Sequence, residues 1–305
     1  MGELGLPGAV LAFEDGIAAA RRLAEDLQCE LAPVALHRFP DGESLVTLPA
    51  QLPETIVVYQ PLNNPNARLI ELLLACDTAR QLGAKTLILV APYLGYMRQD
   101  KAFRRGQAIS QRIIGDHLSR WVDGVVTVDP HLHRVHRLRD ALPHCPSVNC
   151  TAAPLLGDHL RRNTIQGLLV GPDEESRQWV QRVADACSLD FVIAQKQRDG
   201  DRQVTVTIPA YDYRNRPAIL IDDVISSGRT LIEAAGALYR AGVSQVSALC
   251  THALYSEADG RALADAGICS VTSTDAVPHV SNGITLAPLL AEGIHQLLAT
   301  HNDQR

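Results

Sequence analysis

The sequence predicts an α/β protein of two similar halves, each folded around a mainly parallel sheet that is flanked by helices. Short apolar runs alternate along the chain with longer segments of helical spacing, and this rhythm is typical of parallel sheets. Aromatic residues make up only 4% of the 305 residues and hydrophobic residues 46%, so aliphatic side chains must fill the core, as in layered α/β folds. A chain of this length is long enough for two domains of ordinary size.

The first half is expected to contain three buried strands that alternate with two helices. The strands are predicted at residues 55–60, 86–91 and 125–129, and helical spacing occurs at 67–82 and 110–121. Because each helix lies between two of these strands, the segments indicate consecutive βαβ units of one parallel sheet.

The second half repeats this alternation. Strands are expected at 167–171, 190–195, 218–221, 245–250 and 270–273, and helices at 152–161, 174–187, 231–240, 257–266 and 286–300. The alternating segment 204–208 indicates a strand that pairs antiparallel. A domain boundary is expected where two prolines interrupt the pattern at 142–146, which gives domains at residues 1–146 and 147–305.

The net charge, the apolar runs and the cysteine content indicate which partners and which cellular compartment to expect. The net charge of −6 implies no basic face of the kind that nucleic-acid binders need, so we expect no nucleic-acid partner. No apolar run reaches the roughly 20 residues of a membrane helix, and the first residues have no signal-peptide pattern, so we expect no membrane association. The seven cysteines are scattered without a CxxC pair, which is typical of reduced thiols in a cytoplasmic protein.

The segment 218–230 carries the clearest chemical signal. Four apolar residues lead into two adjacent carboxylates, Asp222 and Asp223, and a turn rich in serine and glycine then opens a helix. The backbone N–H groups of such a turn and the dipole of the helix suit a phosphate monoester. The two carboxylates suit vicinal hydroxyls or a bound metal, as in a sugar phosphate. Ser227 or Thr230 taken alone fits a simple helix N-cap equally well.

Polar clusters also follow the strands of the first half. In the segment 92–101, an Arg fork suits polyphosphate and an amide suits a purine edge, although these residues alone are more typical of a solvated charged loop. The segment 129–133 places histidines directly after a strand, without a recognised zinc spacing. Ligands of open parallel sheets bind beyond the carboxyl ends of the strands, where both clusters are expected.

Taken in order, these motifs resemble the ribose-phosphate diphosphokinase family, the synthetases of phosphoribosyl pyrophosphate (PRPP). The resemblance covers nearly the whole chain. Each motif alone is a weak to moderate indication, but their order and spacing together are specific for this family. It rests on the motifs at residues 38–43, 63–66, 92–100, 129–131, 172–173, 196–198, 222–230, 277–282 and 287–292. It implies two phosphoribosyltransferase-like domains, with an ATP site in the first and the ribose 5-phosphate site and catalytic loop in the second.

The resemblance implies an enzyme that uses Mg²⁺ to transfer the diphosphate of ATP to the C1 hydroxyl of ribose 5-phosphate, giving PRPP and AMP. It also implies a homo-oligomer, dimer or hexamer, whose ATP site spans two subunits. The implied site residues are Phe39, Asp41, Glu43, Arg98, Gln99 and Asp100 for ATP; Asp222, Asp223, Ser226, Ser227, Gly228, Arg229 and Thr230 for ribose 5-phosphate; His131 and Asp173 for the metal; and Lys196 and Arg198 for catalysis.

Several residues depart from the family pattern. Glu174, Glu175 and Ser176 replace a glycine-rich turn, and the two extra carboxylates should repel a phosphorylated substrate unless Mg²⁺ or Arg177 compensates. Arg229 stands at a position where glycine is common in the family. These departures leave the exact pentose phosphate open, and they leave two alternatives: a non-catalytic regulatory paralogue of the synthetase, or a phosphoribosyltransferase that consumes PRPP.

Overall fold

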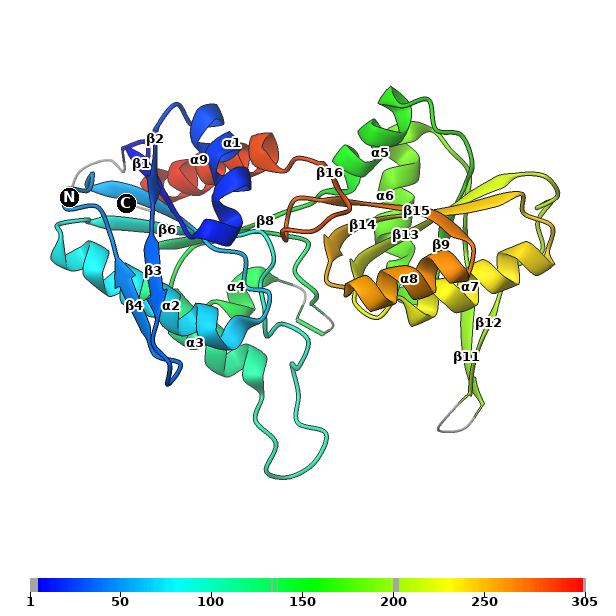
Figure 1. Cartoon of the computed structure of the whole chain (residues 1–305), viewed down its shortest axis with the longest axis horizontal. Coiled ribbons are helices and arrows are strands. Elements are labelled where there is room, and N and C mark those ends of the chain that lie inside the picture. Colours follow the sequence, from blue (N-terminus) through cyan, green and yellow to red (C-terminus); the bar gives the residue numbers. More distant parts are fainter. Residues whose placement is uncertain (1–4, 133, 136, 200–202, 304–305) are drawn as a thin grey trace. The chain divides into compact units, whose positions relative to one another are not determined.

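The computed structural model describes residues 5–132, 134–135, 137–199 and 203–303, which form two compact units (Figure 1). The first unit combines Met1–Cys150 with Ala276–Pro278 and Thr285–Arg305, and the second combines Thr151–Asp275 with His279–Ile284. We expected two continuous domains that meet at residue 146. In the structure the first unit extends to Cys150, and the chain returns to it at its C-terminal end.

The sheet of the first unit has the strand order β2-β1-β5-β6-β7-β8, and its neighbouring strands pair in parallel (Figure 1). Its strands are β1 (Ala9–Ala12), β2 (Glu30–Pro33), β5 (Thr55–Tyr59), β6 (Thr86–Ala91), β7 (Gly124–Val128) and β8 (Ser147–Cys150). The three strands expected from the apolar runs are confirmed as β5, β6 and β7. All residues of these three strands are buried, which explains why they lack an alternating pattern.

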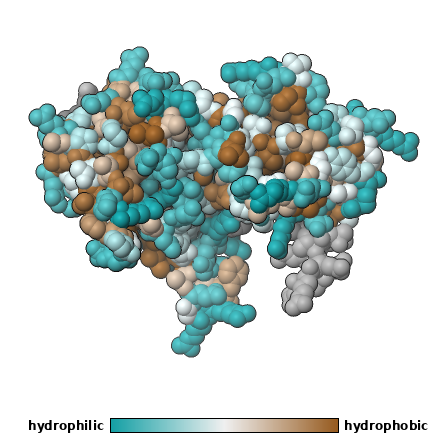
Figure 2. Space-filling model, in the orientation of Figure 1, coloured by the Kyte–Doolittle hydropathy of each residue, from teal (hydrophilic) through white to brown (hydrophobic). Residues whose placement is uncertain are grey.

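The helices of the first unit lie on both faces of this sheet. They are α1 (Ile17–Asp26), α2 (Pro65–Gln81), α3 (Ser110–Trp121), α4 (Leu138–Ala141) and α9 (Ala287–Asp303), with a short 3-10 turn η1 at Glu14–Gly16. The connection between β6 and α3 projects from the unit in Figure 1, and Figure 2 shows hydrophilic residues at its tip. No described helix is both long and apolar enough to cross a membrane.

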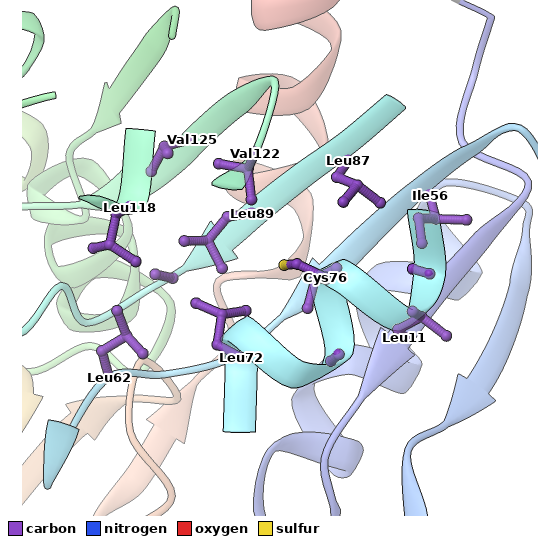
Figure 3. Close-up of a cluster of buried hydrophobic side chains, with 14 of the residues drawn as sticks. Leu11, Ile56, Leu62, Leu72, Cys76, Leu87, Leu89, Leu118, Val122 and Val125 are labelled. Atoms are coloured by element: carbon purple, nitrogen blue, oxygen red, sulfur yellow. The ribbon is translucent and has the colours of Figure 1, made fainter. Parts of the chain in front are cut away.

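The core of the first unit lies between the sheet and helices α2 and α3. Figure 3 shows Leu72 and Cys76 of α2 beside Leu87 and Leu89 of β6, with Leu118 of α3 at the same layer. These side chains are almost completely buried. They are aliphatic or thiol groups, so the core agrees with the low aromatic content of the chain.

Helix α9 packs on the first unit because a glycine lets it approach the sheet closely. A Cβ atom added to Gly293 would lie 2.7 Å from the Cys150 Sγ and 2.9 Å from the Val126 Cγ1. The same helix also lies beside α1 (Figure 1). The apolar spacing of this segment predicted a helix but could not show which sheet the helix covers.

The second unit contains another six-stranded parallel sheet, with the order β10-β9-β13-β14-β15-β16. Its strands are β9 (Leu168–Gly171), β10 (Phe191–Ile193), β13 (Pro217–Ile225), β14 (Gln245–Ala253), β15 (Ile268–Thr274) and β16 (Asn282–Ile284). Its helices are α5 (Ala153–Arg162), α6 (Arg177–Cys187), α7 (Arg229–Arg240) and α8 (Glu257–Asp265), and a 3-10 turn η2 spans Glu174–Ser176. One apolar cluster includes residues of α7 and α8, and another includes residues of α5 and α6.

Each unit also carries an antiparallel hairpin outside its main sheet. In the first unit β3 (Ala35–Arg38) pairs with β4 (Ser44–Thr47), and in the second β11 (Gln195–Asp199) pairs with β12 (Gln203–Thr207). The antiparallel pairing expected for 204–208 is confirmed. Residues 196–198, which the family resemblance implied to open the catalytic loop, lie within β11 because they continue the ladder with β12.

Candidate functional site

The carboxylates Asp222 and Asp223 lie near the carboxyl end of β13, between β9 and β14. We expected the strand to end at residue 221, before these carboxylates. It continues past them, because pairing with β14 extends to Ile225. Asp222 is half-buried and Asp223 is buried. The backbone N–H of Asp223 donates a hydrogen bond of 3.0 Å to the Asp222 Oδ1, which holds one carboxylate against the backbone of the other.

Burial and neighbouring negative charge both act on the ionisation of Asp222 at this strand end. Desolvation raises the pKa of Asp222 well above its ordinary value, and the charges of Asp223 and Asp173 raise it further. Asp173 lies in the connection that follows β9, the neighbouring strand, so the fold brings three sequence-predicted residues together. A ligand that offers hydroxyl donors or a cation would relieve this repulsion.

The loop after β13 opens helix α7 through a left-handed residue. Gly228 is the N-cap of the helix and has φ +68°, a conformation that favours glycine. Ser226 and Ser227 are exposed in the loop, and Thr230 lies half-buried in the first turn of α7. The first N–H groups of a 12-residue helix therefore face the same loop as the serine hydroxyls, an arrangement suited to an anion.

Arg229 adds an exposed positive charge at the start of α7. Hydrogen bonds from Ser256 hold the pKa of Asp259 below its ordinary value, and the charge of Arg229 lowers it further. Asp259 belongs to the capping box that begins α8. Arg229 therefore lies within electrostatic reach of the amino end of α8.

The turn η2 shows how the carboxylates of Glu174 and its neighbours are accommodated. The Asp173 Oδ1 accepts hydrogen bonds from the backbone N–H groups of Glu175 and Ser176, at 3.1 and 3.3 Å. The Arg177 Nε and Nη2 both donate to the Glu174 carboxylate, and the Nη2 lies 2.9 Å from the Oε2. This hydrogen bonding lowers the pKa of Glu174, so Arg177 compensates one of the two added charges, as the sequence suggested.

In the first unit, residues 39–43 form a tight loop between β3 and β4. The Phe39 N–H donates to the Glu43 carbonyl at 2.8 Å, and the Gly42 N–H donates to the Phe39 carbonyl at 2.9 Å. The Asp41 Oδ1 accepts the Glu43 N–H at 3.1 Å. Phe39 is 42% exposed, and its ring packs nearly perpendicular to the His37 ring, with 4.9 Å between the ring centroids. The loop thus presents an aromatic ring and carboxylates at the surface.

A groove of about 480 Å³ separates this loop from helix α2. The loop contributes Asp41, Gly42 and Glu43 to its wall, and α2 contributes Ile70 and Leu74. Both apolar side chains are more than one third exposed. The groove therefore combines carboxylates on one side with aliphatic surface on the other.

The connection from β6 to α3 carries Arg98, Gln99 and Asp100, which have different surroundings. Arg98 is exposed. The Gln99 Oε1 accepts a hydrogen bond from the Ser110 Oγ at 3.2 Å. The Asp100 carboxylate accepts the Arg134 N–H at 2.9 Å and the Arg134 Nη1 at 2.7 Å. Gln99 and Asp100 thus fix the connection, whereas Arg98 is exposed at the surface.

His131 follows β7, two residues after a strained position. Asp129 is buried, has φ +39°, and donates its N–H to the Cys150 carbonyl at 3.0 Å, which ties the end of β7 to β8. His131 is half-buried. It belongs to the first unit and Asp173 to the second, so the two predicted metal-binding residues are placed in separate units.

The carboxylates present suit Mg²⁺ better than a metal that needs a full protein cage. Among the described residues, no group of three or more His, Cys, Asp or Glu side chains could hold a metal ion by itself. Mg²⁺ usually keeps several waters and is held by one or two carboxylates together with substrate phosphates. The crowded oxygens of Asp173, Asp222 and Asp223 provide donors of the required kind.

Lys196 and Arg198 lie on β11, where their Cα partners on β12 are Val206 and Val204. Their side chains lie outside the described residues, so the roles assigned to them remain predictions.

Sequence reasoning missed residues that hold the first-unit loops in place. Arg134 anchors Asp100, and Glu71 of α2 binds Arg38 at the base of the loop 39–43. Glu71 did have a signal: it occurs at a helical position that is otherwise apolar, one turn before Ala75. Arg134 offered no comparable signal, because it is one of several arginines in a polar segment.

Comparisons with known proteins agree with this geometry. Residues 9–121 match the N-terminal domain of ribose phosphate pyrophosphokinase, and residues 152–285 match the phosphoribosyl transferase domain. The ribose-phosphate pyrophosphokinase of Methanopyrus kandleri is 35% identical over 94% of this chain and 99% of its own length. Ribose-phosphate pyrophosphokinase 2 of Archaeoglobus fulgidus is 34% identical over 90% of this chain and 96% of its own.

The crystal structure of phosphoribosylpyrophosphate synthetase from Mycobacterium smegmatis has the same fold, with a TM-score of 0.79 over 97% of this chain and 99% of that one, at 23% identity. The two expected phosphoribosyltransferase-like domains are thereby confirmed. On the strength of the full-length relatives, this chain belongs to the ribose-phosphate pyrophosphokinase family of enzymes.

Proposed function

We propose that this enzyme transfers the diphosphoryl group of ATP to the C1 hydroxyl of ribose 5-phosphate, giving PRPP and AMP. The observation that carries the proposal is the segment from β13 to α7, in which two carboxylates, a hydroxyl-rich loop and a helix N-terminus follow one another. Relatives that match almost the whole chain carry the name ribose-phosphate pyrophosphokinase, which agrees with such a site.

The acceptor would bind along this segment in a single orientation. Its 5-phosphate would accept hydrogen bonds from Ser226, Ser227 and the N–H groups at the start of α7, where the helix dipole favours negative charge. Its 2- and 3-hydroxyls would donate to Asp222 and Asp223, which lie just before the loop in the same chain. The C1 hydroxyl would then be held at the open side of the site.

The reaction exchanges one P–O bond for another. The C1 oxygen attacks the β-phosphorus of ATP, the bond from that phosphorus to the oxygen shared with the α-phosphate breaks, and AMP leaves with that oxygen. The proton of the C1 hydroxyl passes to water. Catalysis of this kind depends mainly on positioning and on stabilising charge, so we assign Lys196 and Arg198 to the transferred group.

Bound Mg²⁺ would neutralise phosphate charge on ATP. Asp173, and His131 directly or through water, are the residues that we propose to hold it.

The nucleotide would bind to the first-unit loops. The exposed ring of Phe39 would contact the adenine, and Asp41 and Glu43 would accept hydrogen bonds from the nucleoside hydroxyls. Arg98 is exposed and would meet the polyphosphate. We further propose a homo-oligomer, dimer or hexamer, in which this site is completed by a second subunit. The free cysteines favour a reducing, cytoplasmic location.

The direct test is AMP formation from ATP and Mg²⁺, measured with and without ribose 5-phosphate. We expect AMP only when the acceptor is present. A folded protein with no turnover would contradict the proposal. Pull-down of an active synthetase by a protein that has no activity alone would instead indicate a regulatory paralogue, and consumption of PRPP with a free base would indicate a phosphoribosyltransferase.

A further inference from the structure

Glu71 is an acidic residue in the apolar stripe of helix α2. It lies among Leu69, Leu72 and Ala75 on the buried side of the helix, and it is only 2% exposed. A carboxylate at such a position costs free energy unless it is paired and hydrogen-bonded. Its partners therefore indicate why the position is not apolar.

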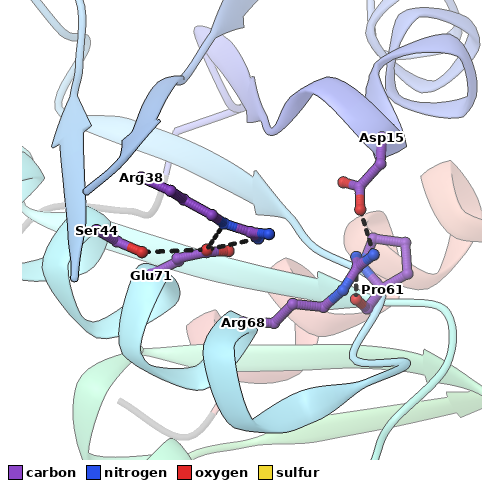
Figure 4. Close-up of polar contacts among 6 residues, drawn as sticks. All are labelled: Asp15, Arg38, Ser44, Pro61, Arg68 and Glu71. Atoms are coloured by element: carbon purple, nitrogen blue, oxygen red, sulfur yellow. Dashed lines mark hydrogen bonds and ion pairs between the residues drawn. The ribbon is translucent and has the colours of Figure 1, made fainter. Parts of the chain in front are cut away.

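The hydrogen bonds that Arg38 and Ser44 donate to the Glu71 carboxylate converge on one oxygen, as Figure 4 shows. The Oε1 accepts the Arg38 Nη2 at 2.9 Å and the Arg38 Nε at 3.3 Å. It also accepts the Ser44 Oγ at 3.3 Å. The Arg38 side chain is 61% exposed, so the buried carboxylate holds a side chain that reaches in from the surface.

The two donors occupy matched positions on the hairpin. Arg38 is the last residue of β3, Ser44 is the first residue of β4, and their Cα atoms are register partners. Between them lies only the loop 39–43. Glu71 therefore binds both strands at the base of this loop and connects them to the second turn of α2 by hydrogen bonds. We call this connection the tie.

The hairpin needs such a tie because its own pairing is short. Each strand has four residues, and the two form a separate two-stranded sheet outside the main one. Isolated two-stranded hairpins are marginally stable in water. The hydrogen bonds within the loop fix its internal shape, but they do not fix its orientation on the unit.

We propose that Glu71 is the positioning residue of the nucleotide loop 39–43. By holding Arg38 and Ser44, it orients Phe39, Asp41 and Glu43 toward the nucleotide without touching it. This inference rests on the proposed function for the ligand, but the tie itself is a property of the free protein and can be measured without substrate.

Glu71→Leu is the main test, because leucine keeps the helix and suits the apolar surroundings while removing the acceptor. We expect the KM for ATP to rise about 10- to 100-fold, as for lost hydrogen bonds to a charged group, while the KM for ribose 5-phosphate changes by less than about 2-fold. Glu71→Gln retains an acceptor oxygen and should return the KM for ATP to within about 5-fold of the parent value.

The matched control is Asp123→Asn, which weakens another ion pair of the same helix. The Asp123 Oδ2 accepts the Arg80 Nη2 at 2.6 Å near the C-terminal end of α2, away from the hairpin. It also accepts the Leu87 N–H at 2.7 Å, a bond that asparagine can keep. We expect this variant to leave both KM values unchanged.

Amide hydrogen exchange provides the readout that does not depend on activity. In Glu71→Leu, the N–H groups of Phe39 and Gly42 should exchange at least about 10-fold faster, while those of β6 keep their protection. If the parent protein makes no AMP, the proposed function fails, and this exchange experiment still decides whether the tie exists.

Should Glu71→Leu fold poorly, the double variant Arg38→Met with Glu71→Leu removes both partners and leaves no unpaired charge. It should show the same kinetic and exchange changes as the single variant. The proposal is overturned if the KM for ATP stays unchanged, if both KM values rise together, or if Asp123→Asn has the same effect.

Discussion

The two candidate ligand sites are built in different ways. In the second unit, Asp222, Asp223, the serine loop and the start of α7 are contiguous, so the chain itself fixes their order and spacing. In the first unit, the corresponding residues lie on separate connections that are anchored by side chains distant in sequence: Arg38 by Glu71, and Asp100 by Arg134.

This difference decides where each site is vulnerable. A contiguous site is damaged mainly by changes within it, because neighbouring backbone supplies most of its geometry. A site assembled from separate loops depends on residues that never touch the ligand.

The largest effect is expected for Lys196→Ala in the β11–β12 hairpin. Removal of a cation assigned to the transferred group should lower kcat by about 10³-fold, as for other cations that stabilise phosphoryl transfer, while ribose 5-phosphate still binds. Single-turnover AMP formation and equilibrium binding of ribose 5-phosphate measure the two effects separately. Loss of acceptor binding would show that Lys196 has a different role.

The second largest effect is expected for the pair of carboxylates in β13. Replacing both Asp222 and Asp223 by Asn should lower kcat/KM for ribose 5-phosphate by at least about 100-fold, because each carboxyl group is exchanged for an amide that has one acceptor oxygen and places an NH₂ donor opposite the sugar hydroxyls. The KM for ATP should change little. Steady-state kinetics with each substrate varied in turn provide the measurement, and an unaltered acceptor KM would remove these residues from the site.

A smaller effect is expected for Gly228→Ala at the N-cap of α7. The added Cβ would lie 2.7 Å from the Leu263 Cδ2, and the left-handed backbone is strained for alanine. We expect the KM for ribose 5-phosphate to rise about 5- to 10-fold, since about 1 kcal/mol of strain is added at the loop.

Gly236→Ala is the control for this variant, because it lies in the same helix and its Cβ would meet only the Arg240 Nη1 at 3.4 Å. It should leave the acceptor KM unchanged. Equal effects of the two variants would argue that helix stability, rather than loop geometry, controls binding.

The smallest expected effect concerns the pH dependence of stability in the first unit. Burial opposes ionisation of Asp100, but hydrogen bonds from Arg134 hold its pKa below the ordinary value of 3.8. Since the folded pKa is the lower one, this carboxylate stabilises the fold above the unfolded pKa, and the contribution is lost as the pH falls through the folded pKa.

Urea unfolding of the parent and Asp100→Asn tests this sign. The difference in free energy of unfolding should stay constant above about pH 5 and shrink in more acidic solution. A difference that grows on acidification would contradict the assignment.

The same contrast explains what the sequence could predict. The strands β5, β6 and β7 and the segment from Asp222 to Thr230 were predicted because their signals are local: apolar runs, adjacent carboxylates and a glycine turn. The ion pair of Arg38 with Glu71 joins residues 33 positions apart, so no local pattern specifies it. Such contacts become visible only when the sheet and helix are packed.

Two further differences between the expected and the observed fold have the same cause. Strand β13 continues past the carboxylates because β14 remains available to pair with Val224 and Ile225. Helix α9 joins the first unit because Gly293 permits close contact with β7 and β8. In both cases the helix or strand was predicted from its own residues, whereas its partner was set by tertiary packing.

Product identity tests the central claim most directly. Phosphorus NMR of the protein with Mg²⁺, ATP and ribose 5-phosphate should show AMP together with a diphosphate attached to the sugar, in equal amounts, as expected for transfer of the β,γ-diphosphoryl group. Formation of ADP with a sugar bisphosphate, or release of AMP without a new diphosphate ester, would contradict the account.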